Sequence, residues 1–168
     1  GADQVIKSKV QQLNEQQSEA AERARLKAVE ARQQAAQKKE VREQELQQMG
    51  RPLLTALRRQ ASLLLQGVAR KETLRCLDRA TWSNERSSDL WQFKDSSAVF
   101  YANHPELRPW LGTQEPPAPV TLSLLLGLVS TINARSEPFT DAMEQDFLER
   151  LIGDVVQTYR DVMTRKEA

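Results

Sequence analysis

Cysteine and histidine are almost absent from this chain, whose 168 residues hold one of each, Cys76 and His104. A single cysteine excludes an internal disulfide, and one cysteine with one histidine excludes a thiolate–imidazole zinc site within a single chain. The six glycines are scattered singly, so there is no glycine-rich phosphate loop, and no Gly-x-Ser-x-Gly nucleophile elbow is present. The sequence therefore predicts a protein that is not an enzyme and uses no cofactor or metal.

Long apolar runs and an excess of one charge are also missing. The longest apolar candidate, Val120–Ile132, is interrupted by Thr, Ser and Gly and is shorter than the ~18 residues that span a bilayer, so we expect a buried core helix. The net charge of +1 provides no general attraction for nucleic acid or anionic lipid. The chain begins Gly-Ala-Asp rather than with methionine, so a membrane anchor outside this sequence stays compatible with these expectations.

Residues 3–49 contain no glycine, proline or aromatic residue and consist mainly of Gln, Ala, Glu, Arg and Lys, which are strong helix formers. Ile6, Val10 and Leu13 follow the 4-3 spacing of a coiled-coil seam, but the seam continues through alanine, which buries little area. In composition the segment resembles the helical stalks of cell-envelope spacer proteins. We expect a rod that spaces two objects apart or pairs with another helix.

Larger apolar residues are concentrated after Met49. Gly50 is expected to end the rod and Pro52 to start a helix that carries an apolar stripe and continues to about Trp82, with Gly67 as a position where it could kink. Ser87 or Ser88 is expected to cap a further helix holding the aromatic residues between Leu90 and Phe100. Cys76, which lies between two leucines, is expected to be a small buried hydrophobe.

The last helix is expected after Thr140 as its cap, with acidic residues in its first turns as the helix dipole favours. Its apolar stripe is expected to belong to the core and comprises Phe147, Leu148, Leu151, Ile152, Val155, Val156, Tyr159, Val162 and Met163. No strand pattern is convincing. The sequence thus predicts an all-α fold, with a long N-terminal single helix or coiled-coil rod over 3–49 and a compact bundle of about four helices over 51–165.

Two groups of side chains are candidate binding residues. All three tryptophans lie between Trp82 and Trp110, where they either fill the bundle or anchor a protein partner. The candidate partner-binding residues are Ile6, Val10, Leu13, Trp91 and Trp110. Residues 51–80 hold seven basic residues against two acidic ones, so this stretch either binds phosphate or complements the acidic C-terminal helix. The candidate basic face consists of Arg58, Arg59, Arg70, Lys71 and Arg75.

These features predict a non-enzymatic structural or interaction protein. A helical stalk would present a small helical bundle that docks a protein partner, or associates with itself through helices, in a larger or membrane-anchored assembly. The alternative is a nucleic-acid-associated adaptor that binds through a basic helix over residues 51–79.

Overall fold

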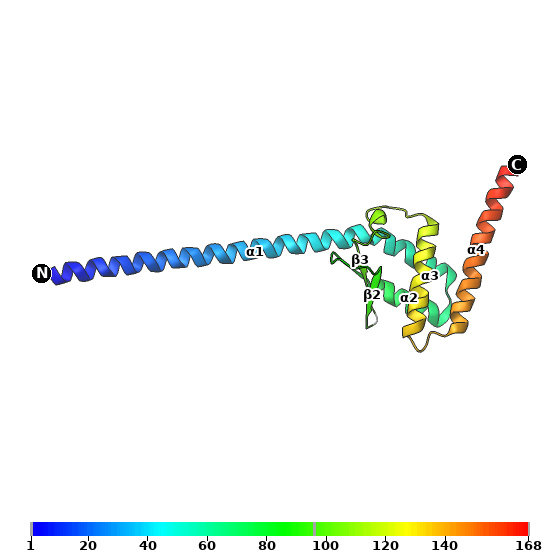
Figure 1. The fold of residues 1–168 in the computed structure, drawn as a ribbon, viewed down its shortest axis with the longest axis horizontal. Helices are drawn as coiled ribbons and strands as arrows, with labels where there is room; N and C mark the ends of the chain where they lie inside the picture. Colours follow the sequence, from blue (N-terminus) through cyan, green and yellow to red (C-terminus); the bar gives the residue numbers. More distant parts are fainter. Residues whose placement is uncertain (1, 96, 168) are drawn as a thin grey trace. The chain divides into compact units, whose positions relative to one another are not determined.

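The computed structural model describes residues 2–95 and 97–167 (Figure 1). Within these residues the helices are α1 (Ala2–Leu64), α2 (Gly67–Asp78), α3 (Ala118–Arg135) and α4 (Asp141–Glu167), with a short 3-10 helix, η1 (Arg108–Trp110). The strands are β1 (Thr81–Ser83), β2 (Trp91–Lys94) and β3 (Ser97–Tyr101). The mostly helical fold and the long N-terminal helix are confirmed, but the prediction of a purely all-α chain is wrong because of the small sheet.

The chain divides into two compact units, Gly1–Gln44 and Glu45–Ala168. In the first unit α1 is the sole element, and every described residue from Ala2 to Gln44 is exposed. This follows from the composition, because Ala, Gln, Glu, Lys and Arg favour a helix without supplying large apolar side chains to bury. The second unit contains the hydrophobic core and all the other elements.

The expectation that a helix ends at Gly50 and another starts at Pro52 is wrong, since α1 continues to Leu64. Proline lacks the N–H that would bond to the carbonyl of Gln48, which weakens a helix when nothing compensates. Here the turns after Pro52 bury one apolar face in the core: Leu53, Leu54, Leu57, Ala61 and Leu64. The Met49 carbonyl also accepts a hydrogen bond from the Gly112 N–H at 2.9 Å, which ties this part of α1 to the loop after η1.

The helix expected to run on to Trp82 is broken between Leu64 and Gly67. Gln66 is extended (φ −132°, ψ 158°), and Gly67 has a φ of +54°, a left-handed conformation that glycine adopts without strain. An ion pair of 3.2 Å between Arg58 and Asp78 then joins α1 to the end of α2. The apolar pattern alone did not show this break, because residues on both sides of it face the same core.

The three strands form one sheet in the order β1-β3-β2, with β1 parallel and β2 antiparallel to β3. The helix expected between Leu90 and Phe100 is therefore wrong. Aromatic residues are dense in this segment, and they favour a pleated, half-buried surface. Ser87 caps no helix here; its hydroxyl accepts a hydrogen bond from the Asp89 N–H at 3.0 Å and forms a local turn.

The Leu-rich segment is the core helix α3, as expected, and its buried residues include Leu124, Leu125, Leu128, Val129 and Ile132. Judged by length and composition alone, α3 would also be able to cross a membrane, but core helices of soluble proteins pass the same test.

Phe100 of β3 is fully buried and contacts two tryptophan rings. Its ring centre lies 5.2 Å from that of Trp82 and 5.9 Å from that of Trp91. The sheet therefore packs its aromatic side chains into the same core as α1 and α3.

Strand β1 is completed on its free edge by a side chain of α1. The Gln47 amide donates through Nε2 to the Trp82 carbonyl and accepts through Oε1 from the Trp82 N–H, both at 3.0 Å. The two bonds replace the partners that a neighbouring strand would offer to this edge.

Replacing Gln47 by alanine is expected to lower the free energy of unfolding by about 1–3 kcal/mol, because both backbone groups of Trp82 lose their partners in a part-buried site. The exposed neighbour Gln48 provides the control, and Gln48→Ala should change stability by less than about 0.5 kcal/mol. Urea unfolding followed by tryptophan fluorescence measures both. Equal effects of the two substitutions would show that Gln47 does not stabilise the strand.

Candidate protein-docking surface

The first turns of α4 are attached to α3 by polar contacts. The Asn133 side-chain amide near the end of α3 donates to the Asp141 carboxylate and to the Glu144 carboxylate, each at 2.8 Å. The Thr140 carbonyl accepts from the N–H groups of Met143 and Glu144 at 3.1 Å, and its hydroxyl oxygen accepts from Met143 at 3.4 Å, as expected of a cap. Figure 1 shows α3 and α4 side by side beyond this connection.

Only the first part of α4 contributes to the core. Phe147 is fully buried, and Met143, Leu148 and Leu151 are half-buried against the core cluster. Every described residue from Ile152 onward is exposed. The expectation that the whole apolar stripe of this helix belongs to the core is therefore wrong.

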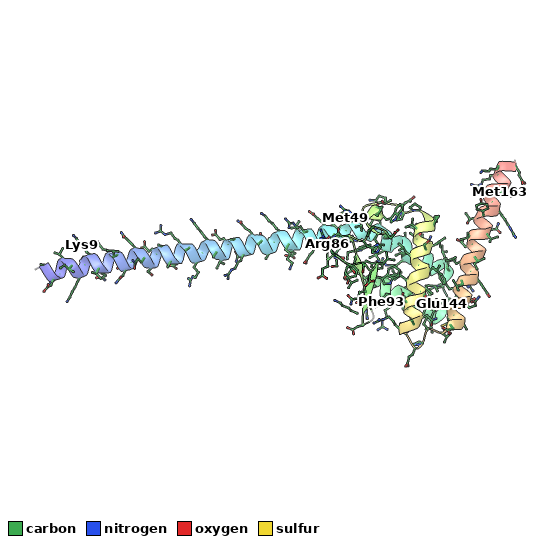
Figure 2. All side chains as sticks on the ribbon, in the orientation of Figure 1. Lys9, Met49, Arg86, Phe93, Glu144 and Met163 are labelled. Atoms are coloured by element: carbon green, nitrogen blue, oxygen red, sulfur yellow. The ribbon has the colours of Figure 1, made fainter. Side chains whose placement is uncertain are left out.

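The exposed part of the stripe, called here the α4 stripe, comprises Ile152, Val155, Val156, Tyr159, Val162 and Met163. These six side chains remain between 42% and 69% exposed. Figure 2 shows the side chains near Met163 standing apart from the crowded side chains around Glu144 and Phe93. Within residues 2–95 and 97–167, nothing covers the stripe, and such a large contiguous apolar patch is typical of an interaction surface.

The α4 stripe has the spacing of a coiled-coil seam. Leu148, Ile152, Val155, Tyr159 and Val162 are separated by four, three, four and three residues. Val156 and Met163 widen the seam on one side. On the opposite face the Gln157 amide donates to the Asp161 carboxylate at 3.0 Å, so this face is polar and internally bonded.

The length of α4 was the sequence signal that distinguishes this surface from core. A helix of 27 residues extends about 40 Å, whereas the 18 residues of α3 extend about 27 Å. Full overlap with α3 would leave the last nine residues of α4 uncovered, and α4 loses contact with the core still earlier, after Leu151, where it diverges from α3 (Figure 1). Periodicity alone does not reveal this, because a docking stripe and a core stripe have the same spacing.

The candidate partner residues lie in different surroundings. In the first unit, Ile6, Val10 and Leu13 are between 52% and 60% exposed, so their side chains are free to pack against another helix. Trp91 and Trp110 are half-buried and pack against the core cluster. The Trp91 ring lies over Gly127 of α3, where an added Cβ would come within 2.9 Å of it. Both tryptophans thus help to fill the core, and partner binding by any of these five residues stays a prediction.

The candidate basic residues do not lie on one helix over 51–79, because that helix is interrupted before Gly67. Arg58 and Arg59 belong to α1, while Arg70, Lys71 and Arg75 belong to α2. Two of the five have partners within the fold. Arg58 pairs with Asp78, and the Arg70 guanidinium donates to the Leu65 carbonyl at 2.8 Å.

Arg59 lines a groove of about 600 Å³ together with Arg51, between α1 and the start of α3. Glu115 lies in the same groove and offsets part of this positive charge. Nucleic-acid binding by the basic residues stays a prediction.

Cys76 is buried, as expected of a small hydrophobic residue. Burial raises the pKa of its thiol to about 11, against a smaller opposing effect of a hydrogen bond from the Ala98 backbone. A thiol with this pKa stays protonated near neutral pH and is a poor nucleophile.

His104 is half-buried and structural in its contacts, since its Nδ1 accepts a hydrogen bond from the Glu106 N–H at 3.1 Å. Among the described residues, no three His, Cys, Asp or Glu side chains are grouped as metal ligands.

Comparison with protein-family models, curated proteins and solved structures gave no match to this chain. The class of protein is therefore inferred from the α4 stripe and its surroundings.

Proposed function

We propose that this protein is a non-enzymatic interaction protein whose α-helical domain docks a protein partner through the α4 stripe. The N-terminal helix serves as a stalk or spacer in a larger or membrane-anchored assembly. The observation that carries the proposal is the exposure of six large apolar side chains on α4, beyond the point where Phe147 attaches the helix to the core.

A helix is the partner element that fits this surface best. A 4-3 repeat places apolar side chains along a narrow line, where they insert between the side chains of a second helix. A sheet edge would require free backbone N–H and C=O groups, which α4 uses within its own hydrogen bonds. The partner is accordingly an amphipathic helix with a matching apolar repeat.

A membrane surface fits the α4 stripe less well. Helices that lie on anionic lipid are rich in Lys and Arg on the polar face. The polar side of this segment carries Asp154 and Asp161 beside Arg160 and Arg165, so its charges nearly balance. The attraction to anionic headgroups would be weak, whereas a mixed polar face is usual for a helix that pairs with another helix.

The proposal is tested by placing a benzophenone-bearing phenylalanine derivative in place of Tyr159 and irradiating the cells that produce the protein. The matched control carries the same group in place of Gln157, on the opposite face of α4. We expect a discrete protein adduct at position 159 and little or none at position 157. The adduct should disappear when Val155→Glu is added, because the carboxylate cannot be buried in an apolar seam.

An adduct with a second copy of the chain or with another protein would both support docking through the α4 stripe. The absence of any protein adduct at position 159, or equal adducts at positions 157 and 159, would contradict it.

A further inference from the structure

We propose that the helix covering the α4 stripe is α4 of a second copy of this chain, packed antiparallel. This inference rests on the proposed function and names the partner of the same surface. The stripe is centred near Gln157, so a twofold axis at this level brings the stripes of two copies together over their whole length.

Antiparallel packing pairs large side chains with smaller ones. Residues whose numbers add up to 314 then face each other, so Ile152 of one copy faces Val162 of the other, and Val155 faces Tyr159. Parallel packing would instead stack the two Tyr159 rings on each other and leave the two Val155 side chains with less to fill the gap. Interdigitation of unequal side chains favours the antiparallel arrangement.

Charge also favours this arrangement. The C-terminal end of α4 has a net charge of +1 from Arg165, Lys166 and Glu167, whereas the other end of the seam has −1 from Asp146, Glu149 and Arg150. Antiparallel packing brings Arg165 of one copy level with Glu149 of the other at both ends of the pair. Parallel packing would place the two positive ends beside each other and the two negative ends beside each other, where like charges repel.

The area of the stripe is sufficient for a modest dimer. Six large side chains that are 42% to 69% exposed give each copy an apolar patch on the order of 500 Å². Two patches reach about 1,000 Å², the lower limit of specific interfaces. Leu148 and Leu151, which are half-buried, extend the contact toward the core. We therefore expect a reversible dimer that dissociates on dilution.

Sedimentation equilibrium of the full chain over a concentration series measures the association. We expect the wild-type chain to form dimers, and Val155→Glu to raise the dissociation constant at least ~100-fold because it buries an uncompensated charge. The matched control Gln157→Glu adds the same charge two residues away, on the polar face, and should dimerise as the wild type does. Circular dichroism of each variant verifies that the helices remain folded.

Cysteine cross-linking in a glutathione redox buffer determines the orientation. The Ile152→Cys chain and the Val162→Cys chain should each form no disulfide dimer alone. When the two variant chains are mixed they should form a disulfide with each other, since positions 152 and 162 face each other only in the antiparallel pair. The wild-type chain is the control, because the buried Cys76 thiol is not accessible.

A disulfide formed by Ile152→Cys alone would overturn the antiparallel arrangement. Dimers that persist in Val155→Glu, or that dissociate equally in Gln157→Glu, would overturn pairing through the stripe. A wild-type chain that stays monomeric at a protein concentration 100-fold above that of the urea unfolding experiments would overturn self-association. If position 159 still cross-links to a different protein, docking through the α4 stripe survives that result.

Discussion

Gly50→Ala is expected to destabilise the second unit by about 2–3 kcal/mol, although the same change stabilises an ordinary helix interior by about 1 kcal/mol. Gly50 is buried within α1, and a Cβ at this position would overlap the Trp82 indole, meeting Nε1, Cε2 and Cδ1. The indole cannot move aside easily, because Trp82 is 4% exposed and its ring contacts that of Phe100. The energetic cost of overpacking therefore exceeds the stabilisation from the higher helix propensity of alanine.

Gly153 provides a matched control for this prediction. It lies in the interior of α4, and nothing is within 4 Å of a Cβ placed there. Gly153→Ala should therefore raise the free energy of unfolding, because only the higher helix propensity of alanine acts at this position. Urea unfolding of the two variants, at a protein concentration low enough to avoid association, compares the signs. A stabilising effect of Gly50→Ala would contradict the packing of Trp82 against α1.

Phe147→Ala is expected to lower the free energy of unfolding by about 3–5 kcal/mol. Phe147 is fully buried, and among the described residues of α4 it is the one that the core encloses. Its removal leaves a cavity at the position where α4 is attached to the rest of the domain. Loss of this contact should also free α4 from α3, which hydrogen exchange of the α4 amides would detect as faster exchange.

Tyr159→Ala is the control for Phe147, because it removes an aromatic ring from the same helix at a position that is 69% exposed. Its effect on the stability of the monomer should stay below about 0.5 kcal/mol. The two results together distinguish the attached part of α4 from its docking part. A large loss of stability in monomeric Tyr159→Ala would show that the stripe packs within its own chain.

The effects expected at Gly50, Gly153 and Phe147 and the proposed function all depend on which apolar contacts are made within one chain. Phe147 and Trp82 have their partners inside the second unit, whereas the α4 stripe has none among the described residues. Because core and interface use the same apolar side chains, only this difference in burial separates a stability residue from a docking residue.

The sequence by itself determined the features that depend on local composition and period. The helical character of residues 3–49 follows from the propensities of Ala, Gln, Glu, Lys and Arg, and the core helix α3 follows from a nearly continuous apolar run. The burial of Cys76 and the cap at Thr140 were also readable, because each depends on its neighbours in the chain.

Tertiary structure decided the features in which distant residues act on each other. Gly50 and Pro52 usually end helices, but α1 continues through them because its apolar face is buried beyond them and because Trp82 requires the space at Gly50. Trp91–Lys94 and Ser97–Tyr101 form strands rather than a helix because their aromatic side chains pack into the core from a sheet. The edge of that sheet is completed by Gln47. The α4 stripe has the period of a core helix, and it is a surface because the contacts of α4 with the core end at Leu151.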